Sequence, residues 1–165
     1  MARTNDRGVN DLLIEDARII FRNFSGKATK FKPEGQRRFC VILEADEKTL
    51  AGMADFGWNI KYLKPREEED LPVPYLEVDV RFENFPPKII QITSKGRTPL
   101  NVDMVGSLDY AEIARADVLI TPYQWEVGPR TGIKAYLKQA NIILRENALD
   151  MKEYDLSEFD GPTAI

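Results

Sequence analysis

Residues 117–144 read DVLITPYQWEVGPRTGIKAYLKQANIIL, two runs of alternating character on either side of the short turn GPRT (128–131). Within the second run, Ile133, Ala135 and Leu137 alternate with polar residues, which is typical of a strand with one buried face. Two such runs around a short glycine-containing turn predict an antiparallel hairpin, with strands at 117–127 and 132–144.

Further strands are predicted along most of the chain. The most regular alternation is YLEVDVRF (75–82), where Leu76, Val78, Val80 and Phe82 share one face. We expect the other strands at 12–24, 37–43, 58–64 and 88–95. One helix is predicted at 44–57, with Asp46 as its N-cap, Gly57 as its stop, and Leu50, Met53 and Ala54 on one face. Residues 101–113 are expected to form a loop with a helical turn.

These elements define the fold class. Seven or so strands and one helix predict an all-β domain with a small helical insertion, built as an antiparallel barrel or sandwich. The length of 165 residues fits one domain. We place this domain at 1–145 and an acidic C-terminal tail at 146–165, which begins as a helix and ends disordered.

The composition excludes several classes of function. The chain has no histidine, which removes the commonest general base and the usual zinc ligand, so neither a metal nor another cofactor is expected. Its one cysteine, Cys40, lies in the apolar run FCVIL and is expected to be buried. There is no apolar signal region or membrane-length run, and we expect a cytoplasmic protein with no membrane partner.

The charge is distributed unevenly. The chain has a formal net charge of −4, yet residues 18–38 hold seven Lys or Arg and one acid, with Phe24 and Phe31 among them and Phe39 directly after. Residues 146–165 hold six acids and one base. A basic, aromatic segment in an otherwise near-neutral body, followed by an acidic tail, indicates nucleic-acid binding.

Single-stranded nucleic acid requires cations for its phosphates and aromatic rings for its unstacked bases. The side chains expected to hold phosphates are Arg22, Lys27, Lys30, Lys32, Arg37, Arg38, Lys61, Lys64, Lys134 and Lys138. The side chains expected to stack on bases are Trp58, Tyr62, Tyr123, Trp125 and Tyr136. Because side chains two apart in a strand point the same way, Lys134, Tyr136 and Lys138 share one face. The hairpin can bring this face onto the same surface as Tyr123 and Trp125.

Other interpretations of these residues stay open. The aromatic residues can belong to the core. The basic loop, SGKATKFKPEGQRR (25–38), can be merely solvated. Glu77 and Asp79 share a strand face and could hold magnesium as in a nuclease, assisted by Lys88 or Lys95, but an exposed pair of this kind is more often solvated, and we expect no catalysis. The turn TSKGRT (93–98) lacks the spacing of a phosphate-binding loop. The tail either solubilises the protein or binds a partner through Glu158, Phe159 and Asp160.

The sequence also resembles a family of single-stranded DNA-binding proteins of bacteriophages and prophages. The resemblance rests on FRNFSGKATKFKPEGQRRFCVIL, GWNIKYLKPRE, PPKIIQITSKGRTPL, LDYAEI and VGPRTGIKAYLKQANIIL, which together span most of 12–145. It implies an OB fold, a small Greek-key barrel, with elaborated loops. It further implies a role in coating exposed strands during phage DNA replication or recombination, and a tail that contacts replication proteins. The tail here ends in GPTAI instead of an aromatic residue.

We therefore expect a non-catalytic, sequence-tolerant single-stranded DNA-binding protein in the bacterial host cytoplasm. The alternatives are a recombination mediator that anneals strands on the same face and an adaptor whose basic face docks an acidic protein. The sequence leaves the oligomeric state open.

Overall fold

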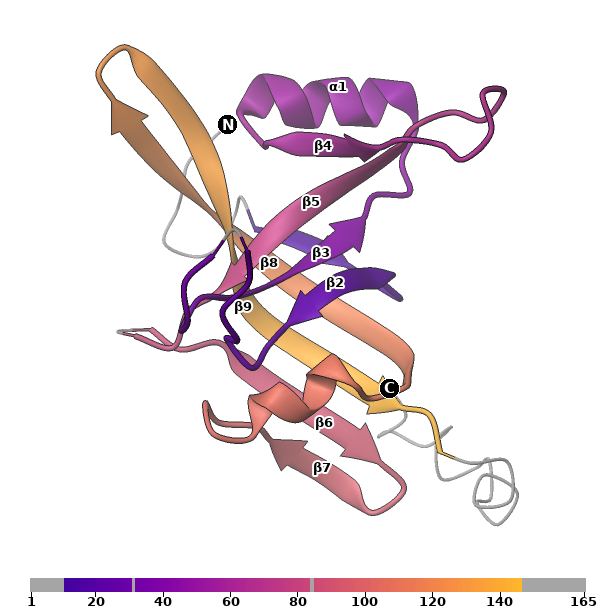
Figure 1. Cartoon of the computed structure of the whole chain (residues 1–165), viewed down its shortest axis with the longest axis vertical. Helices are drawn as coiled ribbons and strands as arrows, with labels where there is room; N and C mark the ends of the chain where they lie inside the picture. The colour runs from indigo at the N-terminus through magenta and orange to yellow at the C-terminus, as the bar shows by residue number, and fades with distance from the viewer. Residues whose placement is uncertain (1–10, 31, 84, 147–165) are drawn as a thin grey trace.

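The computed structural model describes residues 11–30, 32–83 and 85–146, so the predicted tail beyond Glu146 lies outside the described residues. Within these described residues, one α-helix and one short 3-10 helix accompany the strands, which are shown in Figure 1. The elements in chain order are β1 (Leu12–Ile14), β2 (Ile19–Asn23), β3 (Arg37–Ile42), α1 (Glu47–Phe56), β4 (Ile60–Leu63), β5 (Val73–Val80), β6 (Lys88–Thr93), β7 (Gly96–Pro99), η1 (Val105–Asp109), β8 (Ile113–Val127) and β9 (Arg130–Leu144).

The expectation of an all-β protein with a small helical insertion is confirmed. Strands of the described part pair in the order β1-β8-β9-β5-β3-β2, with β4 added to β5 and the β6–β7 pair added to β9. All pairs are antiparallel except β5 with β9 and β6 with β9. The first strand in this order, β1, and the last, β2, both come from the N-terminal part of the chain. Strand β1 pairs with β8, and β2 pairs with β3. This order is compatible with the partly open Greek-key barrel of an OB fold.

The predicted hairpin is the longest feature of the sheet. Its strands β8 and β9 have 15 residues each, and its tip extends beyond the rest of the sheet in Figure 1. The turn is shorter than GPRT, because Val127 already pairs with Arg130. Gly128 has a φ of 61° and takes the first central position of this two-residue turn, where type II′ hairpins place glycine.

The predicted helix is confirmed together with both of its ends. The Asp46 carboxylate accepts a hydrogen bond from the Thr49 backbone N–H at 2.7 Å, and Gly57 ends the helix with a φ of 119°. Leu50, Met53 and Phe56 of α1 pack against the core. Ala54, which the helical spacing placed on the same face, is instead exposed.

Two expectations about strands need correction. Residues 12–24 form two strands, since Asp16 takes a φ of 52° and its backbone N–H donates to the Asp117 carboxylate at 2.8 Å. This bend lets one short segment serve two parts of the sheet. Strand β7 was not predicted, because all four of its residues are exposed and carry no apolar pattern. It pairs with β6 across the turn that ends at Gly96.

The inward faces of the strands build one core. Leu76, Val78 and Val80 from β5 are buried, as are Ile133, Ala135 and Leu137 from β9, which confirms the predicted phase of both strands. Cys40 is buried as expected, and burial, followed by the nearby Glu77 charge, raises the pKa of its thiol to about 11.

Across the part of the chain described here, no helix is long and apolar enough to cross a bilayer.

Candidate nucleic-acid interface

The outward face of β5 and β9 brings together charged and aromatic side chains from distant parts of the sequence. Asp79 of β5 lies directly beside Tyr136 of β9 in the parallel register. Arg38 of β3 pairs with Asp79 from the other side of β5. Because neighbouring residues in register point to the same face of a sheet, these side chains form one surface.

A groove of about 300 Å³ runs over this surface, between the loop that precedes β3 and strands β5 and β9. We call it the basic groove. Its lining holds five cationic side chains and two carboxylates, Asp79 and Glu83. The cationic and aromatic residues of the lining are Lys32, Arg37, Arg38, Arg81, Lys134 and Tyr136.

The loop that supplies Lys32 is fixed at its base. The Asn23 side chain accepts hydrogen bonds from the backbone N–H groups of Gly26 and Lys27, both at 3.1 Å. The Asp109 carboxylate of η1 accepts from the N–H groups of Phe24 and Ser25. The start of the basic loop is therefore a defined turn bound to η1, which aims the rest of the loop toward the sheet.

Arg22 must be removed from the predicted phosphate contacts. Its Nη1 donates to the backbone carbonyls of Leu108 and Ala111, each at 2.7 Å. These two bonds tie β2 to η1 and its following turn, so the guanidinium has a structural task.

Lys27 is exposed, but its ammonium group lies 4.8 Å from the centre of the Tyr110 ring and donates to its hydroxyl. That hydrogen bond raises the pKa of Lys27.

Two half-buried carboxylates lie among the cations of the sheet face. Glu77 contacts Arg38 Nε at 2.9 Å and Lys61 Nζ at 3.1 Å. Asp79 contacts Lys134 Nζ at 3.2 Å. Burial opposes ionisation of Glu77, but the hydrogen bond from Lys61 and the charges of Lys61, Lys32 and Arg38 outweigh it, so the pKa of Glu77 lies below its ordinary value. Through these pairs the two carboxylates contact two cations of the groove, Arg38 and Lys134.

Two tyrosine rings, those of Tyr123 and Tyr136, lie at the basic groove or beside it. Tyr123 is 56% exposed, and its ring centre lies 5.8 Å from that of Tyr136. The Tyr136 hydroxyl accepts a hydrogen bond from Arg81 at 3.3 Å, and this contact raises the pKa of Arg81. The pairing of Tyr123 with Lys134 confirms that the hairpin brings the two predicted sets onto one surface.

The prediction that Trp58 stacks on bases is wrong. Its side chain is only 7% exposed and belongs to the core, where its ring lies 6.3 Å from that of Phe56. It follows the helix stop at Gly57 and forms an isolated bridge with Ile133 of β9. Trp125 is instead half-buried near the hairpin tip and faces two cavities.

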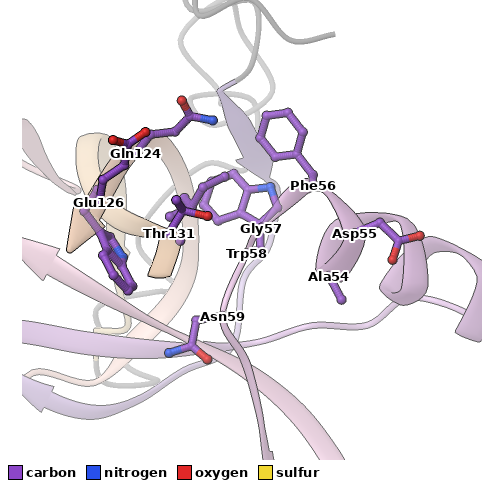
Figure 2. A pocket seen from close by; sticks show the side chains of 12 residues that line it. Ala54, Asp55, Phe56, Gly57, Trp58, Asn59, Gln124, Glu126 and Thr131 are labelled. Carbon is purple, nitrogen blue, oxygen red and sulfur yellow. The ribbon is translucent and has the colours of Figure 1, made fainter. Parts of the chain in front are cut away.

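These two cavities continue the basic groove. The Trp125 cavity, of about 230 Å³, shares Asp79 and Lys134 with the groove. The hairpin cavity, of about 700 Å³, shares Asn59, Trp125 and Ile133 with the Trp125 cavity. Figure 2 shows Gln124, Glu126 and Thr131 of the hairpin on one side of it, and Ala54, Asp55 and Phe56 at the helix end on the other.

The remaining predicted residues lie outside this continuous depression. Lys30, Lys64 and Tyr62 are exposed but line none of the three cavities. Lys61 joins the surface only through Glu77, and Lys138 contacts the Asp11 carboxylate at 2.9 Å. Glu158, Phe159 and Asp160 fall outside the described residues.

Reasoning from the sequence missed Arg81, which lines the basic groove, and Tyr110, which contacts Lys27. Arg81 lies at the end of the most regular alternation, where its phase relative to Glu77 and Asp79 already placed it on the outward face. Tyr110, which is 75% exposed, follows η1 in a segment without periodicity. No local signal connects it with Lys27, 83 residues away in the chain.

The chain matches, over residues 1–164, the family described as "Putative phage ssDNA-binding domain", and it belongs to that family. Among solved structures, it is similar to the single-stranded DNA-binding protein from bacteriophage Enc34 in complex with ssDNA. The TM-score is 0.57 at 12% identity, over 87% of this chain and 90% of that chain.

Two further structures of the Enc34 protein give the same result. The protein without DNA has a TM-score of 0.55 at 12% identity, covering 93% of this chain and 90% of that one. Its C-terminal truncation has a TM-score of 0.56 at 11% identity, covering 87% and 90%. A search among curated protein sequences finds no significant match. Family and neighbours are single-stranded DNA-binding proteins, and the similarity at this level of identity establishes the shared fold.

Proposed function

We propose that this protein binds single-stranded DNA in the continuous depression formed by the basic groove, the Trp125 cavity and the hairpin cavity. The observation that carries the proposal is their continuity, because each shares lining residues with the next. A flexible single strand can follow three adjoining cavities, whereas a duplex is stiff over this length.

The types of side chain that line the cavities support two kinds of DNA contact, with phosphates and with bases. Lys32, Arg37, Arg38, Arg81 and Lys134 hold phosphates at the basic end. Trp125 and the Tyr123–Tyr136 pair offer rings on which bases of any sequence can stack. Binding of this type is broadly sequence-tolerant and weakens as salt rises. The protein acts by coating and not by catalysis.

The family description supports a role in phage biology. We propose that the protein coats exposed strands during phage DNA replication or recombination, in the cytoplasm of the bacterial host. Residues 1–145 form the DNA-binding domain, and the acidic segment 146–165, with its six acids and one base, recruits replication or recombination proteins and competes with DNA for the basic groove. Glu158, Phe159 and Asp160 are the proposed centre of that contact.

Tryptophan fluorescence tests the proposal directly. The protein is titrated with an unlabelled oligonucleotide of about 30 nucleotides, chosen to exceed the site size of an OB fold, and with the matching duplex. We expect quenching that favours the single strand and weakens linearly in the logarithm of salt concentration. Trp125→Phe should abolish most of the quenching, since Trp58 is buried. An absence of binding by both fluorescence and gel shift would refute the proposal.

A further inference from the structure

The Trp125 cavity differs in chemistry from the basic groove that it continues. The groove lining has an excess of cations, but the Trp125 cavity is lined by Glu77, Asp79 and Asn59 with Lys134 as its one cation among the described lining residues. A phosphate is attracted to the first environment and repelled by the second. A strand that lies along both therefore turns its phosphates toward the groove and its bases toward Trp125.

The two carboxylates still have hydrogen-bonding capacity. An ionised carboxylate offers about four acceptor positions. One carboxylate oxygen of Glu77 forms an ion pair with Arg38 and the other with Lys61. One oxygen of Asp79 forms an ion pair with Lys134. The ion pairs also fix both groups in direction, so what remains is a set of oriented acceptors and no charged donor beyond Lys134.

A nucleobase offers different groups to such acceptors. Cytosine, adenine and guanine each carry an exocyclic amino group that donates hydrogen bonds, whereas thymine presents a carbonyl oxygen at the position of the cytosine amino group. Carboxylates accept from the cytosine amino group and repel the thymine oxygen. In unpaired strands these base edges are free to be bound.

We propose that the Trp125 cavity is a base-recognition subsite, in which a base stacks on Trp125 and donates its exocyclic amino group to Asp79 or Glu77, so that the protein prefers cytosine to thymine there. Asn59, which lines the same cavity and is labelled in Figure 2, supplies a further polar group at the base edge. Lys134 lies at the border with the groove and holds the adjoining phosphate. This inference rests on the proposed function and adds a modest preference to otherwise tolerant binding.

The test compares short oligonucleotides of deoxycytidine and thymidine of equal length at neutral pH, by calorimetry. We expect the deoxycytidine oligomer to bind more tightly by about three- to tenfold, below the full discrimination of a bidentate base contact. Asp79→Asn and Glu77→Gln each replace an acceptor-only group with one that can also donate to thymine. Each variant should therefore bring the ratio of the two affinities closer to one.

The ratio is the decisive quantity, because removing a negative charge strengthens binding of any strand equally. Glu83→Gln is the matched control, since Glu83 lines the basic groove but not the Trp125 cavity and contacts Arg81 at 3.6 Å. It should raise both affinities and leave the ratio unchanged. Equal affinities in the unmodified protein, or a ratio that survives in both variants, would overturn the inference while leaving the proposed function intact. Binding of neither oligomer would refute the proposed function itself.

Discussion

Trp125 packs directly against Gly132, its paired neighbour across the hairpin. A Cβ atom built on Gly132 would stand 2.7 Å from Cζ2 of the indole and 2.9 Å from Cε2. No real Cβ contact is this short, so the ring occupies space that only glycine leaves free. Glycine at this position therefore leaves room for a ring that lines two of the cavities.

Gly132→Ala should consequently push Trp125 out of place without removing it. We expect the free energy of single-stranded DNA binding to weaken by about 1–3 kcal/mol, the range found when a stacking ring is lost. Fluorescence anisotropy of a labelled oligonucleotide measures this change. Gly52→Ala is the matched control, because a Cβ on Gly52 in α1 meets no atom within 4 Å. Unchanged binding by Gly132→Ala would remove Trp125 from the site.

The contrast between Trp58 and Trp125 shows what the sequence could predict. Strand phase and the hairpin were readable from the alternation around Ile133, Ala135 and Leu137. The register was not predictable, and only the structure places Tyr123 beside Lys134. Phase alone cannot say whether a ring near a strand end is covered by another element. Trp58 is buried in the core, where it lies beside Phe56 and bridges Ile133 of β9, a segment distant in sequence.

The cations show the same limit. A cluster of positive charge at 18–38 was evident, and Lys32, Arg37 and Arg38 do line the groove. Arg22, from the same cluster, instead binds carbonyl groups of residues more than 80 positions away. The composition of a segment predicts its charge, but the partners of each side chain are set by the tertiary fold.

Lys134→Ala should reduce the salt dependence of DNA binding. One phosphate contact corresponds to about one unit in the slope of log affinity against log salt, so we expect the slope to fall by about 1. Because the change also leaves Asp79 without its ion-pair partner, the Lys134→Ala/Asp79→Asn double variant separates loss of the contact from added repulsion. Lys48→Ala, on the exposed side of α1, removes the same charge outside the groove. Equal slopes for Lys134→Ala and Lys48→Ala would show that Lys134 holds no phosphate.

Asp109→Asn should loosen the basic loop. The carboxylate accepts from two backbone N–H groups, those of Phe24 and Ser25, and hydrogen bonds to a charged group contribute roughly 1.5–3 kcal/mol each, of which an amide retains a part. We expect the free energy of unfolding in urea to fall by about 1–2 kcal/mol. DNA affinity should fall as well, since Lys32 is carried by this loop. Asp103→Asn, an exposed change in the turn before η1, serves as the control. A variant with unaltered stability and affinity would contradict the anchoring role.

Glu77 should make the stability of the protein depend on pH in the acidic range. Its pKa in the folded protein is below the ordinary value, so folding favours the ionised form. The resulting stabilisation is fully present above the pKa of the unfolded chain, roughly 4.3, and is lost as pH falls through the lower folded value. Urea midpoints measured from neutral pH downward should therefore decline below about pH 5, where protonation of the unfolded chain begins.

Glu77→Gln identifies the share of this decline that belongs to Glu77. The variant should be less stable at neutral pH, because Arg38 and Lys61 lose their partner, and its midpoint should change less with acidification. Other carboxylates titrate in the same range, so the difference between the two proteins is the informative quantity. Glu83→Gln removes an acid whose side chain is 68% exposed and should leave the profile close to that of the unmodified protein. Parallel curves for Glu77→Gln and the unmodified protein would mean that the ion pairs around Glu77 contribute no stability.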